Sequence, residues 1–223
     1  MTKTLTGYLN KMSQILSDRN ITRSYGFLEY YLAMKRAKLA IELISRVPGS
    51  SRVLDIGCGS YPIFLVTAQF AEKFGVDKDV DAKVQDMERI KILEHDIEKG
   101  DKLSFADEHL DVVTMLAVLE HLEHESLPNI FTEIFRVLGP KGRCIITLPS
   151  PRTDLLLRIM SRLRLVSSVE IHEHKPGLEN SAIIDLLTKS GFANIKSGYF
   201  ELFLNRWFVA DKLPKLVAAP TLA

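Results

Sequence analysis

The residues best suited to bind a ligand lie in one short run, Val53-Leu54-Asp55-Ile56-Gly57-Cys58-Gly59-Ser60. Apolar residues typical of a buried strand lead into a glycine-rich turn, and a helix-like apolar run follows it. Gly57 and Gly59 let the backbone turn sharply and approach a ligand without an intervening Cβ, while Asp55 places a carboxylate at the carboxyl end of the strand. The run predicts a loop for a nucleoside cofactor, with a cationic group as the natural partner of the carboxylate.

A dinucleotide site is the main alternative for such a loop. Its G-x-G-x-x-G fingerprint requires a third glycine, which allows the helix and the strand to pack closely around a pyrophosphate. Pro62 stands at that position and removes a backbone N–H donor that a pyrophosphate would use. The sequence therefore disfavours NAD and FAD, and a nicotinamide oxidoreductase with them.

Two more acidic residues follow strand-like runs further along the chain. Asp77 ends the run Phe74-Gly75-Val76-Asp77, about 20 residues after the glycine loop, where related folds place an acid on the ribose hydroxyls. Asp96 ends the run from 90 to 96 and is suited to accept a hydrogen bond from an adenine amino group. A fourth strand is predicted over 110–116. The order of these features matches a nucleoside site at one edge of a parallel sheet.

At this point the chain resembles the class I S-adenosylmethionine-dependent methyltransferases, particularly the compact group that acts on small molecules and metabolites. The resemblance covers residues 50–150 well and 180–211 more loosely. It implies an α/β fold, a Rossmann-like doubly wound seven-stranded sheet that is mostly parallel, with an antiparallel C-terminal hairpin strand and N-terminal cap helices. It also implies S-adenosyl-L-methionine as cofactor, S-adenosyl-L-homocysteine as product and a set of cofactor contacts. These contacts are Asp55, Gly57, Cys58, Gly59, Asp77, Asp96, Ile97, Leu116 and His121.

The second half of the family pattern is also present. The run from 133 to 143 is similar to the family's helix and Gly/Pro turn, and 144–149 to its fifth strand. Residues 181–190 predict a helix capped by Asn180 or Ser181. Two β-rich runs, 195–203 and 206–210, then predict a closing hairpin with its turn around Leu204-Asn205. One departure is the short interval from 77 to 90, which leaves little room for the usual helix after the second strand.

The chain is predicted to consist of one sheet domain with additions at both ends and one insertion. Cap helices over 24–47 and near 4–17 make up an N-terminal segment, 1–48, because apolar residues recur there at helical spacing. The methyltransferase domain spans 49–211, with a lid insertion at about 150–180, and a tail covers 212–223. The Leu/Arg-rich stretch 154–166 is compatible with a helix packed on the core, a lid over the acceptor, or contact of a membrane surface with a lipid-linked acceptor.

The insertion also carries the densest cluster of titratable groups, Ile171-His172-Glu173-His174-Lys175. Imidazole titrates near neutral pH, so His174, or His172 as the second candidate, could act as a general base toward the acceptor. Both could equally be ordinary loop residues. A metal site is not expected, because two histidines at this spacing lack the further ligands that such a site requires.

Composition is ordinary for a soluble globular protein. The 223 residues carry 29 basic and 28 acidic side chains, a net charge of +1 that favours neither nucleic acid nor an anionic surface. The two cysteines, Cys58 and Cys144, are read as small apolar residues rather than a disulfide, which suits a reducing cytoplasm. The start of the chain lacks the layout of a secretion signal, and no apolar run is long enough to span a membrane. We therefore expect a cytoplasmic protein.

The predicted reaction is transfer of a methyl group, by in-line displacement, to an oxygen, nitrogen or carbon nucleophile of a small molecule. The sulfonium already activates the methyl group, so the protein must mainly orient the nucleophile and exclude water. A non-catalytic nucleoside-binding or scaffold protein of the same fold is the alternative. The oligomeric state and the acceptor are left open by the sequence.

Overall fold

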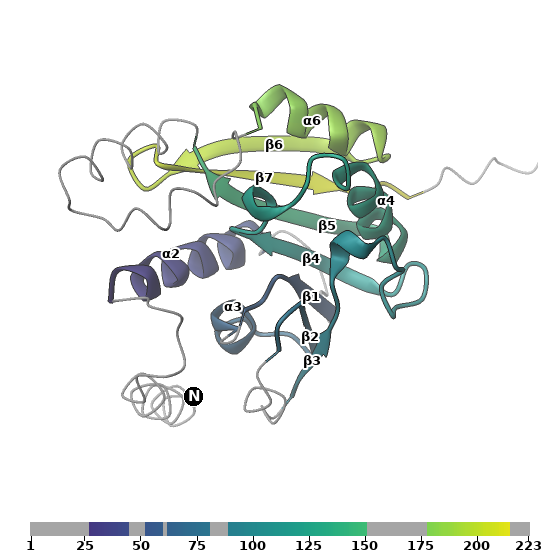
Figure 1. Ribbon diagram of the computed structural model, residues 1–223, viewed down its shortest axis with the longest axis horizontal. Coiled ribbons are helices and arrows are strands. Elements are labelled where there is room, and N and C mark those ends of the chain that lie inside the picture. Colours follow the sequence, from purple (N-terminus) through teal and green to yellow (C-terminus); the bar gives the residue numbers. More distant parts are fainter. Residues whose placement is uncertain (1–26, 45–51, 60–61, 81–88, 151–177, 215–223) are drawn as a thin grey trace, which may run out of the picture.

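The computed structural model describes residues 27–44, 52–59, 62–80, 89–150 and 178–214. These residues form one seven-stranded sheet with the strand order β3-β2-β1-β4-β5-β7-β6 (Figure 1). The strands are β1 (Arg52–Ile56), β2 (Glu72–Asp77), β3 (Ile90–Glu94), β4 (Leu110–Leu116), β5 (Leu138–Pro149), β6 (Ala193–Phe200) and β7 (Asn205–Asp211). The helices are α2 (Phe27–Ile44), α3 (Ile63–Thr67), α4 (Leu127–Val137) and α6 (Asn180–Lys189), with 3₁₀ turns η1 (Ile97–Lys99) and η2 (Leu119–His121).

The connectivity of the sheet is that of a doubly wound fold. Strands β1 to β5 run parallel, and β7 pairs antiparallel with both β5 and β6. The chain moves outward from β1 through β2 to β3, then returns to place β4 on the other side of β1. Ligands of such sheets bind at the carboxyl ends of the strands at this reversal point. The predicted fold class is therefore confirmed.

Alternating strand side chains build an apolar cluster on each face of the sheet. Even-numbered residues of β1 and β5, such as Leu54 and Ile146, pack with α4 and α6. Odd-numbered residues, such as Val53 and Ile145, pack with α2 and α3. Figure 1 shows these two helix pairs on opposite sides of the sheet. Because α2 packs against α3, β4 and β5, the described part of the predicted N-terminal cap belongs to the core of the sheet domain.

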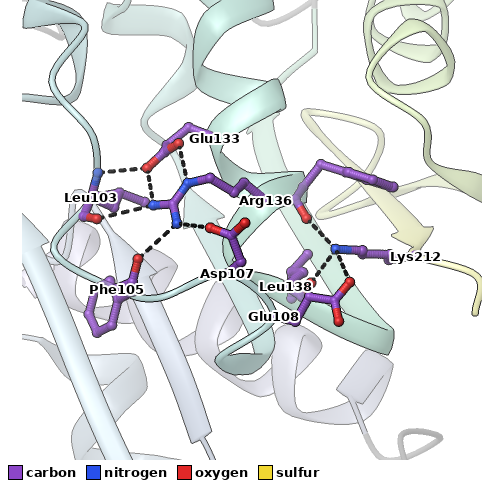
Figure 2. A network of polar contacts seen from close by, with 9 residues as sticks. Leu103, Phe105, Asp107, Glu108, Glu133, Arg136, Leu138 and Lys212 are labelled. Atoms are coloured by element: carbon purple, nitrogen blue, oxygen red, sulfur yellow. Dashed lines mark hydrogen bonds and ion pairs between the residues drawn. The ribbon is translucent and has the colours of Figure 1, made fainter.

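The amino ends of β4 and β5 are joined by a group of polar contacts centred on Arg136, which we call the Arg136 clamp (Figure 2). The guanidinium donates to both carboxylate oxygens of Glu133, to Asp107 Oδ1 (2.6 Å) and to the carbonyl oxygens of Leu103 and Phe105. Glu133 Oε1 also accepts from the Leu103 N–H at 2.7 Å. The clamp ties the segment before β4 to the last turn of α4.

Beside the clamp, Lys212 follows β7 directly and contacts the C-terminal end of α4. Its ammonium group donates to the carbonyl oxygens of Phe135 (2.9 Å) and Leu138 (2.7 Å). It also lies 3.4 Å from a carboxylate oxygen of Glu108 (Figure 2). These bonds satisfy carbonyl groups at the helix-to-strand junction that helical pairing leaves free.

Several predicted boundaries differ from those observed. The strand β5 already begins at Leu138, so the predicted Gly/Pro turn lies within the strand, where Lys141 has a φ of +69° and the pairing with β4 is irregular. The helix α6 is not capped by Asn180 or Ser181: its N-cap is Glu179, which makes no side-chain cap bond. The Asn180 side chain instead accepts a hydrogen bond from Arg206. The hairpin turn spans 201–204, slightly earlier than predicted.

Other predictions fall outside the described residues. These are the helix near 4–17, the stretch 154–166, and most of the lid insertion and of the tail 212–223. The predicted cap helix over 24–47 is observed as α2, Phe27–Ile44. Among the described helices none is long and apolar enough to cross a membrane.

Candidate cofactor and acceptor site

The glycine loop after β1 is fixed by backbone hydrogen bonds to the neighbouring strand. The N–H groups of Gly57 and Cys58 both donate to the carbonyl oxygen of Val76, at 2.8 and 3.2 Å. Gly57 and Gly59 each have a φ of +70°, a left-handed conformation that residues with a Cβ rarely adopt. The glycines are therefore required by the shape of the loop, as the sequence predicted.

Asp77 connects the end of β2 to this loop. Its Oδ2 accepts a hydrogen bond from the Gly59 N–H at 2.8 Å, and its Oδ1 accepts from the Asp79 N–H at 3.1 Å. The side chain is only half-buried, so the carboxylate keeps lone pairs available for a ligand. A Cβ added at Gly59 would meet no atom within 4 Å, which means that the space over the loop is open. A carboxylate beside an open glycine cradle fits a ribose and the chain attached to it.

Asp96 lies two residues beyond β3, which ends at Glu94 beside Asp77 rather than at Asp96 as predicted. The His95 N–H donates to the Asp77 carbonyl oxygen at 2.8 Å, which holds the two strand ends together. Asp96 caps η1 by accepting from the Glu98 N–H at 3.1 Å, and it forms an ion pair with Lys99. Of the two acids predicted to contact ribose and adenine, Asp77 thus ends β2 and Asp96 follows the neighbouring strand β3, in the expected order.

The segment after β4 forms the opposite wall of the loop. Leu116 is half-buried, and Ala117 has a φ of +61° while its N–H donates to the Thr147 carbonyl oxygen at 2.9 Å. A Cβ added at Gly57 would lie only 2.4 Å from Val118 Cγ2. The segment is therefore pressed against the glycine loop. His121, also predicted as a cofactor contact, is exposed at the end of η2.

Asp55 lies beneath the loop rather than in its open space. The residue is 4% exposed, and Asp55 Oδ1 accepts a hydrogen bond from the Thr114 hydroxyl at 2.6 Å. Burial raises the pKa of the Asp55 carboxyl to about 7; the Thr114 bond opposes this rise, and the charge of Asp77 adds to it. Its predicted contact with the cofactor stays a prediction, and the structure adds a role in joining β1 to β4.

The Cys58 side chain points into the core. A Cβ at Gly75 would lie 2.7 Å from Cys58 Sγ, so the thiol occupies the space that this glycine leaves. Burial, together with the charges of Asp55 and Asp77, raises the pKa of the thiol well above its ordinary value. Cys58 is thus a neutral packing residue, and only its backbone faces the loop.

The two histidines predicted as catalytic, His174 and His172, lie outside the described residues, so their role as general base stays a prediction. The described residues contain no group of three or more His, Cys, Asp or Glu side chains that could hold a metal ion. Sequence reasoning missed Glu120 on η2, whose Oε2 is buried without a hydrogen-bond partner among the described residues. An acid placed between Leu119 and Leu122, both buried, was the available signal.

Comparison with known proteins identifies the family. A sequence profile described as the Methyltransferase domain matches residues 27–197, more than half of the chain. The chain belongs to the class I S-adenosylmethionine-dependent methyltransferases. No curated protein matches this methyltransferase.

Solved structures share the fold of this methyltransferase at low sequence identity. A protein from Pyrococcus horikoshii has a TM-score of 0.63 and 21% identity over 86% of this chain and 94% of its own. A SAM-dependent methyltransferase from Archaeoglobus fulgidus has a TM-score of 0.60 and 19% identity, and the match covers 82% of this chain and 99% of that protein. A Thermotoga maritima protein described as a possible histamine N-methyltransferase has a TM-score of 0.58 and 19% identity, and the match covers 83% of this chain and 96% of that protein. At these identities the likeness shows the fold alone.

Proposed function

We propose that this methyltransferase binds S-adenosylmethionine at the carboxyl ends of β1, β2 and β3 and transfers its methyl group to a small-molecule acceptor. The observation that carries the proposal is the half-buried Asp77 carboxylate, held by the Gly59 N–H beside an open glycine cradle. This is the pairing of acid and glycine loop that a ribose and its attached chain require. When bound, the cofactor supplies a methyl group already activated by its sulfonium.

Each part of the site has a separate task in this proposal. Asp77 would hold the ribose hydroxyls, and Asp96 with Ile97 would face the adenine. Gly57 and Gly59 would allow the backbone to approach the methionine part, next to Leu116 on the opposite wall. The protein contributes orientation and exclusion of water, because positioning a nucleophile near an activated methyl group accounts for much of the rate.

The chemical nature of the acceptor decides whether a base is required. A neutral amine or a carboxylate needs none, whereas a hydroxyl group must lose its proton as it attacks. His174, with His172 as second candidate, is proposed for that step. The alternative of a non-catalytic nucleoside-binding protein predicts cofactor binding without transfer to any acceptor.

The test is calorimetric titration of the protein with S-adenosylmethionine and S-adenosylhomocysteine, with NAD as the control ligand. We expect binding of both adenosyl ligands and none of NAD. Asp77→Ala should weaken binding by about ten- to a hundredfold, because a hydrogen bond to a charged group is lost. Asp185→Ala is the matched control, since this exposed acid on α6 forms an ion pair with Lys189 in the next turn. Wild-type affinity in Asp77→Ala would remove the proposed ribose contact, and preference for NAD would reject the proposed cofactor.

A further inference from the structure

Glu120 has a buried carboxylate oxygen that lacks a hydrogen bond. Its Oε2 has no partner among the described residues, although it is shielded from solvent. Glu120 lies on η2, two residues after Val118, whose side chain is in the space next to Gly57. The 3₁₀ turn that carries the unpaired oxygen therefore begins directly after the residue that contacts the glycine loop.

Two other unpaired polar atoms belong to the same end of the sheet. Arg36 of α2 has a buried Nε without a partner in the described part of the chain, and its charge acts on Glu120. Thr147, whose Oγ1 is also buried and unpaired, lies next to Leu116 on β4 and accepts from Ala117 through its carbonyl oxygen. A carboxylate, a guanidinium and a hydroxyl from three elements thus retain hydrogen-bonding capacity near the carboxyl ends of β4 and β5.

The second basic group that acts on Glu120 is already engaged elsewhere. Arg206 of β7 is 1% exposed and donates to the Pro149 and Leu178 carbonyl oxygens and to Asn180 Oδ1. Arg206 therefore has a structural task at the start of α6. Within the described part of the chain the Nε of Arg36 stays unpaired, which leaves this donor available to a ligand together with Glu120.

An unpaired buried polar group costs free energy, so native proteins rarely keep one without a use. Burial raises the pKa of the Glu120 carboxyl to about 7, opposed by its own backbone amide and by the charges of Arg36 and Arg206. Near neutral pH the group therefore changes between a proton acceptor and a neutral acid. Such a group is suited to a ligand that brings a hydrogen-bond donor.

We propose that Glu120 contacts the methyl acceptor and accepts a hydrogen bond from its nucleophilic hydroxyl or amino group, with Arg36 as its charge partner. The inference rests on the proposed function and adds the acceptor class, a polar molecule whose nucleophile carries a proton. As the nucleophile forms its bond to the methyl group, the methyl–sulfur bond breaks and its electron pair stays on sulfur. The proton of the nucleophile passes to the Glu120 carboxylate, so Glu120 takes the role of base that was considered above for His174 and His172.

The first arm of the test separates a ligand-binding role from a structural one. We expect Glu120→Gln to raise the melting temperature at pH 8 by several degrees and to leave it nearly unchanged at pH 5, since the substitution removes an unpaired buried charge only at the higher pH. Glu133→Gln is the matched control and should lower the melting temperature, because Glu133 is fully paired with Arg136 and the Leu103 N–H. A loss of stability in Glu120→Gln comparable to that in Glu133→Gln would assign Glu120 a structural role and overturn the proposal.

The second arm tests recognition of a donor by fragments. Benzylamine, benzyl alcohol and phenol, with toluene as the apolar control, are added to protein saturated with S-adenosylhomocysteine. At least one donor-bearing fragment should raise the melting temperature of the wild type by more than toluene does, and this excess should vanish in Glu120→Gln. An excess that persists in the variant, or the absence of any excess in the wild type, would overturn the proposal. If S-adenosylhomocysteine itself does not bind, the cofactor proposal fails, and the fragments are tested on the ligand-free protein.

Discussion

Gly57 and Gly59 share one left-handed backbone conformation, but only at Gly57 is there no space for a Cβ. Substitutions at the two positions therefore separate the cost of a strained φ from the cost of a steric contact. Gly57→Ala introduces both a strained φ and a contact with Val118, so we expect it to lower the melting temperature by several degrees. Gly59→Ala introduces the strained φ alone, and its methyl group enters the space proposed for the ligand. It should cost less stability than Gly57→Ala while still weakening the binding of S-adenosylhomocysteine. Thermal melts and calorimetry measure both quantities, and equal melting temperatures would show that Val118 is not pressed against the loop.

Asp55 gives the fold a specific pH dependence. Its pKa is raised from an ordinary value near 4 to about 7, so the folded state binds its proton more tightly than the unfolded state does. The stability contributed by this proton is present below pH 4 and is lost as pH rises toward 7, by up to about 1.4 kcal/mol per pH unit. Asp55→Asn should flatten that part of the profile. Urea unfolding of both proteins between pH 4.5 and 8 measures the difference, and parallel profiles would contradict it.

At the scale of elements, the two ends of the parallel strands have different tasks. The amino ends carry the Arg136 clamp, in which charged groups and carbonyl oxygens satisfy one another (Figure 2). The carboxyl ends carry the glycine loop and the unpaired oxygen of Glu120. Stability and ligand binding should therefore respond to different substitutions.

Arg136→Ala tests this separation. Removing the guanidinium takes the Arg136 donors away from Glu133 Oε2 and the Phe105 carbonyl oxygen. The Leu103 carbonyl oxygen and Glu133 Oε1 each lose one of their two donors. We expect the free energy of unfolding to fall by about 2–4 kcal/mol, in the range found when one partner of a buried charge network is removed. Affinity for S-adenosylhomocysteine should stay the same under conditions where the variant is folded.

Lys189→Ala serves as the control for Arg136→Ala. It removes an exposed ion pair with Asp185 on α6, and such pairs contribute about 0–1 kcal/mol. Denaturant titration gives the free energies and calorimetry gives the affinities. A large loss of affinity in Arg136→Ala would show that the two ends of the strands are coupled.

At the scale of the whole molecule, the binding of cofactor should stabilise the fold by mass action. The proposed ligand contacts join three strands around the reversal point of the sheet, so binding requires the folded state. A product concentration of about a hundred times the dissociation constant adds about 2.7 kcal/mol, which corresponds to a rise of about 5–10 °C for a chain of this size. Asp77→Ala should lose most of this rise at the same S-adenosylhomocysteine concentration. Differential scanning calorimetry measures it, and an equal rise in the variant would place the ligand away from β2.

Much of the fold, and the placement of the residues in the candidate site, could be predicted from the sequence because the deciding properties are local. Gly57 and Gly59 were identifiable since only glycine adopts their conformation readily. The position of Asp77 followed from strand periodicity, because an acid that ends a short apolar run lies at the carboxyl edge of the sheet. The limits of α6 and β5 were less well predicted, since their caps and pairing depend on distant partners such as Arg206.

The tertiary structure alone decided which polar groups are paired and which are not. Asp55 forms its bond with Thr114, 59 residues away, and Glu120 is shielded from solvent close to Arg36 of a helix far earlier in the chain. The sequence determined the residue types and the secondary structure that carries them. The ionisation and burial of each group were set by segments brought together in folding, because desolvation depends on every atom that surrounds a charge and not on its neighbours in sequence.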